Sequence, residues 1–127
     1  MSSLNDSSPS ILIVEDEAAM AKALELKLTK EGYIVKVAAN GREGMSALRE
    51  NQFDAMLLDI MMPEVDGWEM METMQREGIS LPILITSNLS QTEDIQRAEA
   101  LGAKKFLVKS NQTLADIVAE VQIVVTG

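Results

Sequence analysis

Short apolar runs recur along the chain, and a longer stretch with apolar residues at every third or fourth position follows each of them. The five runs cover residues 11–14, 33–37, 53–59, 82–86 and 105–109. Their length and their content of Ile, Val and Leu are typical of β-strands. The pattern predicts five strands, and the central ones are nearly continuous apolar runs, as expected for strands buried on both faces.

The stretches that follow these runs predict five helices. The first has apolar residues at positions 21, 24 and 28 and ends at Gly32. Each of the next three begins with a capping residue and a Glu three positions later, and the pairs are Asn40 with Glu43, Asp66 with Glu69, and Ser90 with Glu93. The third helix is expected to stop at Gly78 and the fourth before Gly102, and the last runs from about residue 113 to residue 124.

This alternation of strands and helices predicts an α/β domain whose parallel sheet is covered by helices on both faces. Two strand orders are common for such doubly wound sheets. In either order, ligands bind at the carboxyl ends of the strands, beside the point where the strand order reverses. Candidate functional residues are therefore sought where the strands end.

Size and composition indicate one globular domain. The chain has 127 residues, of which 46% are hydrophobic and 24% charged. No run approaches the roughly 18 apolar residues that a membrane span needs, so no membrane association is expected. Residues 1–9 are rich in Ser, Asn, Asp and Pro and predict a disordered tail before a domain of residues 10–127. This opening lacks the features of a secretory signal, which favours a cytoplasmic protein.

Charge and missing residue types narrow the chemistry. Eleven Lys and Arg oppose twenty Asp and Glu, giving a formal net charge of −9. Such a charge argues against nucleic-acid binding by this chain, and a basic or apolar protein surface is the expected partner. The chain has no Cys and no His, which excludes disulfides, thiolate nucleophiles and a His general base. The groups that remain available for chemistry are carboxylates, Lys side chains, hydroxyls and the backbone.

Polar residues stand at the ends of four predicted strands. They are Glu15 and Asp16 after the first, Asp59 after the third, Thr86 with Ser87 after the fourth, and Lys109 after the fifth. If the strand order is 2-1-3-4-5, the first and third strands are neighbours about 4.8 Å apart and their three carboxylates meet. A hard cation such as Mg²⁺ would relieve their repulsion. With a lysine and a hydroxyl nearby, the cleft would suit a phosphoryl group.

Each of these residues also has a simpler explanation. An acidic pair after a strand is often a helix cap with first-turn charge. Asp59 could be an ordinary loop residue, Thr86 a strand residue chosen for its β-propensity, and Lys109 a solvated side chain. Their joint placement on one rim of the sheet favours a functional site.

Four motifs carry a family resemblance, and they occur in the order I-L-I-V-E-D, L-L-D-I-M-M-P-E-V-D-G, P-I-L-I-T-S and G-A-K-K-F-L-V-K. With them, residues 10–125 resemble the receiver domains of two-component response regulators, the CheY-like family. The resemblance implies a flavodoxin-like sheet of order 2-1-3-4-5. It also implies a Mg²⁺-dependent phosphoacceptor, with Mn²⁺ as an alternative ion. Asp59 would take the phosphoryl group from a sensor histidine kinase or a histidine phosphotransfer protein.

The same resemblance implies roles around Asp59. Asp16 would bind the metal directly and Glu15 mostly through water. Asp59 itself and the backbone carbonyl of Met61 would be the other metal ligands that the protein supplies. Lys109 would pair with the phosphoryl oxygens. Met61 also belongs, with Asn88, to positions that resemble those tuning the phosphoryl lifetime. These two offer no acid–base pair to orient water, so phospho-Asp59 is not expected to be among the fastest to hydrolyse.

Two residues would carry the switch. Thr86 would hydrogen-bond the phosphoryl oxygens and move toward them, and Phe106 would turn inward behind it. This would change the face formed by the fourth helix, the fifth strand and the fifth helix, where a downstream protein target would bind. The protein would be a monomer, or would dimerise on phosphorylation.

Three positions depart from the usual family pattern. The acidic pair is Glu-Asp where Asp-Asp is also common, which should preserve metal binding. Phe106 replaces a frequent tyrosine, so its inward rotamer would lack a hydroxyl hydrogen bond and the switch would depend on packing alone. Ser110 follows Lys109 where a proline, often cis, is usual. A cis bond before Ser110 would cost about 3 to 4 kcal/mol, so this loop is either strained or trans.

The chain ends just after the last predicted helix, so we expect it to act by protein contact, as a stand-alone regulator or as the receiver of a longer protein. Turnover of an independent substrate is not expected. One alternative is an Asp-nucleophile phosphohydrolase, but such enzymes typically carry a second acid where this chain has Met61. Another is a pseudo-receiver scaffold that never takes phosphate. Neither G-x-G-x-x-G nor G-x-x-x-x-G-K-[ST] occurs, which disfavours a nucleotide-binding domain.

Overall fold

The computed structural model describes residues 8–62 and 65–126 and contains one five-stranded sheet. Its strands are β1 (Ser10–Val14), β2 (Ile34–Ala38), β3 (Ala55–Asp59), β4 (Ile83–Ser87) and β5 (Lys105–Val108). They pair in parallel in the order β2-β1-β3-β4-β5. The predicted doubly wound, flavodoxin-like sheet is confirmed. Residues 1–7 of the predicted tail lie outside the described residues.

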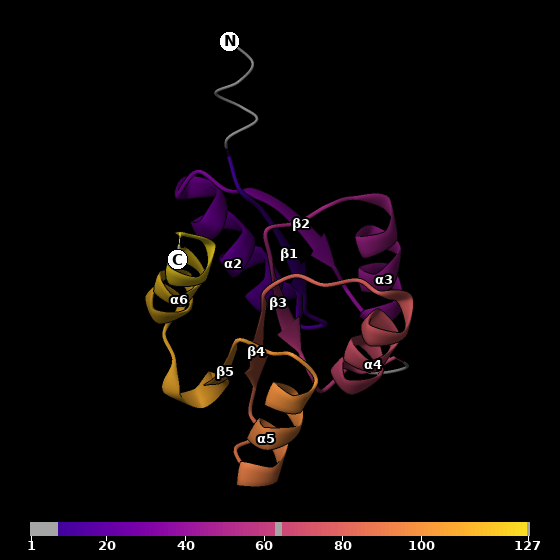
Figure 1. Cartoon of the computed structure of the whole chain (residues 1–127). Helices are drawn as coiled ribbons and strands as arrows, with labels where there is room; N and C mark the ends of the chain where they lie inside the picture. The colour runs from indigo at the N-terminus through magenta and orange to yellow at the C-terminus, as the bar shows by residue number, and fades with distance from the viewer. Residues whose placement is uncertain (1–7, 63–64, 127) are drawn as a thin grey trace.

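Helices cover both faces of this sheet. Within the described residues they are α2 (Ala18–Lys30), α3 (Gly41–Glu50), α4 (Gly67–Glu77), α5 (Thr92–Ala100), a short 3-10 turn η1 (Lys109–Asn111), and α6 (Leu114–Thr126). Helices α2 and α6 lie together on one face, and α3, α4 and α5 cover the other (Figure 1). None of the helices in this part of the chain is long and apolar enough to cross a membrane.

The sheet separates two hydrophobic cores because successive residues of a strand point to opposite faces. In β1, Leu12 packs with the α3 and α4 side and Ile13 with the α2 and α6 side. Every residue of β3 and β4 is buried. The polar members of these two strands, including Asp59 and Thr86, stand at the carboxyl ends.

Helix capping follows the sequence at two of the three predicted positions. The side chains of Asn40 and Asp66 each accept a hydrogen bond of 2.9 Å from the backbone N–H three residues later. The capping box predicted at Ser90 and Glu93 is wrong. Helix α5 begins at Thr92, its N-cap is Gln91, and no side-chain capping bond forms there. Ser90 therefore lies one residue too early to cap the helix.

Candidate functional site

Three carboxylates meet where β1 and β3 end. These strands are hydrogen-bonded neighbours, so the loop after β1 brings Glu15 and Asp16 next to Asp59, the last residue of β3. One oxygen of each carboxylate lies within 4.8 Å of the other two. Glu15 and Asp59 are buried, whereas Asp16 is exposed. The site is therefore open to solvent on the side of Asp16.

The loop after β3 is folded tightly around Asp59. The backbone N–H of Met61 donates to Asp59 Oδ1 at 3.3 Å, and the N–H of Gly67 donates to the carbonyl of Ile60 at 3.0 Å. A β-carbon on Gly67 would lie 2.9 Å from the Asp59 carbonyl oxygen and 2.8 Å from the Ile60 Cα. Only glycine lets α4 begin this close to the phosphoacceptor candidate.

Lys109 faces the three carboxylates from the other side of the cleft. It is the first residue of η1, directly after β5. Its ammonium lies 2.9 Å from Glu15 Oε1, 3.1 Å from Glu17 Oε1 and 3.4 Å from Asp59 Oδ2. No peptide bond in the described residues is cis, so the bond to Ser110 is trans. Without a proline at position 110, the side chain still reaches Asp59.

Glu17 is a site residue that sequence reasoning did not single out. It is the N-cap of α2 but makes no side-chain capping bond. Its carboxylate instead accepts from Lys109, and its N–H donates to Glu15 Oε2 at 3.1 Å. The only sequence signal was its place in the E-D-E run. Nothing local indicates that it pairs with a lysine 92 positions away.

The electrostatics of the cleft follow from crowding of like charges in a buried space. Burial raises the pKa of Asp59 from 3.8 to about 7; the charge of Glu15 adds to the rise, and the Lys109 ammonium opposes it. Burial alone would lower the pKa of Lys109. Its hydrogen bond to Glu15 and the charge of Asp59 outweigh this and hold that pKa above its usual value. The ammonium is therefore charged throughout the physiological range.

The remaining predicted residues surround this centre. Thr86 is buried and pairs in register with Asp59 across β3 and β4, and within the described chain its hydroxyl makes no hydrogen bond. Phe106 is half-buried on β5, against the core on the α3 and α4 side. Met61 and Asn88 line a cavity of about 300 Å³ beside Asp59, and Met61 is 61% exposed.

The donor set fits a magnesium ion. The three clustered carboxylates offer only oxygen ligands, which Mg²⁺ prefers, usually with one or two carboxylates and several waters. Glu15 Oε1 is buried, and it shares the ammonium of Lys109, 2.9 Å away, with Glu17 and Asp59. A buried oxygen left in this way gains from a further cation.

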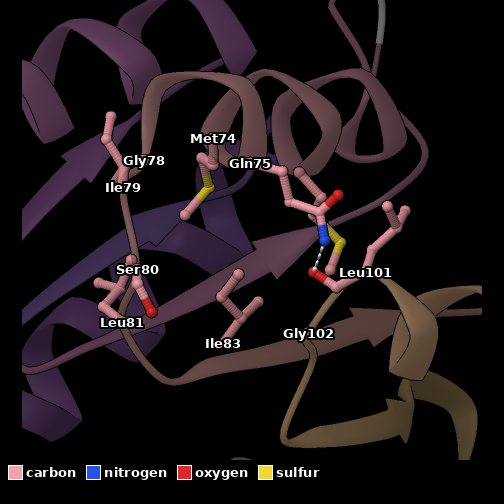
Figure 2. A pocket seen from close by; sticks show the side chains of 10 residues that line it. Met74, Gln75, Gly78, Ile79, Ser80, Leu81, Ile83, Leu101 and Gly102 are labelled. Carbon is pink, nitrogen blue, oxygen red and sulfur yellow. Dashed lines mark hydrogen bonds between the residues drawn. The ribbon is translucent and has the colours of Figure 1, made fainter.

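A larger cavity lies at the opposite edge of the sheet and has an apolar lining. Figure 2 shows it between the end of α4, the start of β4 and the end of α5. It measures about 450 Å³, and its lining includes Met71, Met74, Ile79, Leu81 and Leu101. No titratable side chain is among its lining residues. The smaller, charged cleft at the carboxyl edge is therefore the candidate site for chemistry.

Fold and site together define a doubly wound α/β domain with an acidic cleft at the carboxyl edge of its sheet. The chain belongs to the family of response regulator receiver domains, whose family model matches residues 11–122. These domains are the receivers of two-component systems, and their family acts generally in signalling rather than in catalysis.

Known relatives and structures agree with this membership. The transcriptional regulatory protein AfsQ1 of Streptomyces coelicolor is 38% identical over 82% of this chain, which covers 46% of AfsQ1. The Francisella response regulator 1452 receiver domain is 25% identical, with a TM-score of 0.88 over 94% of this chain and 98% of that one. TrrA of Thermotoga maritima, solved with Mg²⁺ and BeF, is 26% identical, with a TM-score of 0.79 over 91% and 98%. The chain spans about half the length of the curated relatives it matches.

Proposed function

We propose that this domain is a phosphorylation-activated switch in which Asp59 accepts a phosphoryl group from a histidine kinase or a histidine phosphotransfer protein. The observation that carries the proposal is the meeting of a buried carboxylate, two further acids within 4.8 Å and an ammonium 3.4 Å away. The TrrA complex supports it, because that relative was solved with Mg²⁺ and BeF, a pair that resembles a metal-bound phosphoryl group in shape and charge.

In the proposed reaction, an Asp59 oxygen attacks phosphorus and forms the acyl phosphate. The bond from phosphorus to the donor's imidazole nitrogen breaks, and that nitrogen keeps the electron pair and regains a proton from solvent. Lys109 stabilises the negative charge on the phosphoryl oxygens, which is the main task of a protein in such transfers. Thr86 donates its hydroxyl to one of them.

A divalent ion completes the proposal. Asp16, Asp59 and the Met61 carbonyl would hold Mg²⁺ directly, and Glu15 would do so mostly through water. When bound, the ion draws negative charge from the phosphoryl oxygens. The carboxylate must be ionised to attack, so its raised pKa means that the metal and Lys109 also serve to keep Asp59 charged near pH 7.

The signal would leave the site through Thr86 and Phe106. Phe106 pairs in register with Ile85, the neighbour of Thr86, so the two proposed switch residues lie on adjacent strands. Movement of Thr86 toward the phosphoryl group would free space for Phe106 to turn inward. The face built from α5, β5 and α6 would then change and bind a downstream protein target. Because Phe106 has no hydroxyl, only the packing of its side chain would differ between the phosphorylated and the unphosphorylated protein.

The test is incubation with Mg²⁺ and acetyl phosphate, or with beryllofluoride, for the wild type and Asp59→Ala. We expect a mass gain of one phosphoryl group that requires Asp59 and persists beyond seconds. Trp68 is a natural reporter, since its ring in α4 lies 4.3 Å from the Arg97 guanidinium of α5. A wild type that shows neither a mass gain nor an Asp59-dependent change in Trp68 fluorescence would leave only the scaffold alternative.

A further inference from the structure

One hydrogen bond joins two loops of the site, and the proposed reaction does not explain this bond. Asn88 follows β4, and Ser110 lies in η1, directly after Lys109. The side-chain Oδ1 of Asn88 accepts from the backbone N–H of Ser110 at 3.2 Å. N–H groups in the first turn of a helix have no partner within the helix. Asn88 therefore satisfies a donor that the turn itself leaves open.

From this contact we infer that Asn88 is a positioning residue for Lys109. The bond fixes the turn from which the ammonium extends over the cleft. The ammonium contacts three carboxylates at 2.9 to 3.4 Å, so a small movement of the turn would change all three distances. The inference rests on the proposed function, in which Lys109 stabilises the transferred phosphoryl group.

The identity of residue 110 makes this contact available. A proline there would have no N–H to donate, whereas Ser110 supplies one to Asn88. The Lys109 carbonyl accepts from the N–H of Gln112 at 3.2 Å, which closes the same short turn from its other end. Asn88 and Gln112 thus engage both polar groups of the peptide unit that joins Lys109 to Ser110. The oxygen of Asn88 is engaged in this bond, so its influence is directed at Lys109 rather than at an attacking water.

Amide hydrogen exchange of Ser110 tests the contact without metal or phosphodonor. Asn88→Ala should speed the exchange of this N–H by roughly two- to ten-fold, because that factor corresponds to the net free energy of one hydrogen bond. Asn88→Asp keeps an acceptor oxygen and should retain the protection. Asn111→Ala is the matched control, since Asn111 lies exposed in the same turn and its side chain makes no hydrogen bond to the described residues. Equal protection in wild type and Asn88→Ala would overturn the inference.

The rate of Asp59 phosphorylation by acetyl phosphate with Mg²⁺ tests the role. Asn88→Ala should lower it by roughly two- to ten-fold in the wild type and have no further effect in a Lys109→Gln background, because residues that act through one another are not additive. Asn111→Ala should leave it unchanged. The same loss in both backgrounds, or no loss in either, would overturn the inference alone. A wild type that is never phosphorylated would overturn the proposed function and this inference with it.

Discussion

The two ends of the central strands have opposite designs. At the carboxyl end, a cavity of about 300 Å³ is bordered by Asp16, Glu17, Asp59 and Lys109. At the amino end of β4, a larger cavity of about 450 Å³ is lined mostly by Met, Ile and Leu side chains. Size alone would select the second as the functional site. The charges select the first, because buried charges cost stability and are kept mainly where chemistry needs them.

The carboxyl end also has an unbalanced charge. Four carboxylates, those of Glu15, Asp16, Glu17 and Asp59, surround the single ammonium of Lys109. Burial raises the pKa of Asp59 toward neutrality, and repulsion from Glu15 adds to the rise. A site built only for stability would pair its charges or replace them with apolar residues. The excess of negative charge indicates a site that gains from a bound cation.

Loss of the ammonium should have the largest effect on the carboxyl end. We expect Lys109→Gln to slow Asp59 phosphorylation by acetyl phosphate by about 100-fold, the usual scale for removing one preorganised electrostatic group. It should also raise the pKa of Asp59 above about 7, since Lys109 lowers that pKa. Intact mass against time gives the rate. Lys30→Gln, which removes the same charge from the exposed end of α2, should change nothing, and an equal loss in both variants would contradict the assignment.

Truncation at the amino end should change stability and leave the chemistry alone. Met74 is 2% exposed and borders the larger cavity, so Met74→Ala should lower the free energy of unfolding by about 2 to 3 kcal/mol. Leu26→Ala, at a site that is 59% exposed, should cost less than about 0.5 kcal/mol. Urea denaturation measures both. A slower phosphorylation rate in folded Met74→Ala would mean that the two ends are not independent.

A pH titration in the absence of divalent ions should separate the two ends further. The folded protein holds a proton on Asp59 up to about pH 7, whereas the unfolded chain releases it near 3.8. Folding stability should therefore fall as pH rises through this window, by about 2 kcal/mol between pH 5 and pH 7. Asp59→Asn should remove this slope, and Met74→Ala should keep it. If Asp59→Asn kept the wild-type dependence of stability on pH, a group other than Asp59 would be responsible for it.

The fold was predictable from sequence because the strands are short apolar runs buried on both faces. The stretch that became β3, A-M-L-L-D, has no exposed residue, and its end marked Asp59. Membership in the family fixed the strand order, which alternation alone left open. The boundaries were less certain: Ser90 and Glu93 have the spacing of a capping box, but the helix starts one residue later. At α6, Thr113 and Asp116 form a reciprocal box that the sequence reasoning did not identify.

Contacts between loops were beyond the sequence for a different reason. The pair of Glu17 with Lys109 spans 92 residues, and the bond of Asn88 with Ser110 involves a backbone N–H, which every non-proline residue carries. Neither has a local pattern or a distinctive residue type. Both depend on how far the turn after β5 extends over the cleft. Sequence reasoning identified which groups gather at the carboxyl edge but could not predict how Lys109 is held there.

The smallest expected effects concern helix capping at the carboxyl edge, where α4 and α5 both begin. Capping residues there should affect stability and not phosphorylation. Asp66 accepts from the N–H of Glu69 at 2.9 Å, so Asp66→Ala should lower the free energy of unfolding by about 1 kcal/mol. Ser90 precedes the N-cap of α5 and caps nothing, so Ser90→Ala should stay within about 0.3 kcal/mol of the wild type. Thermal unfolding compares the two variants. A clear loss in Ser90→Ala would restore the capping box predicted from sequence, and would mean that α5 begins earlier in solution than it does here.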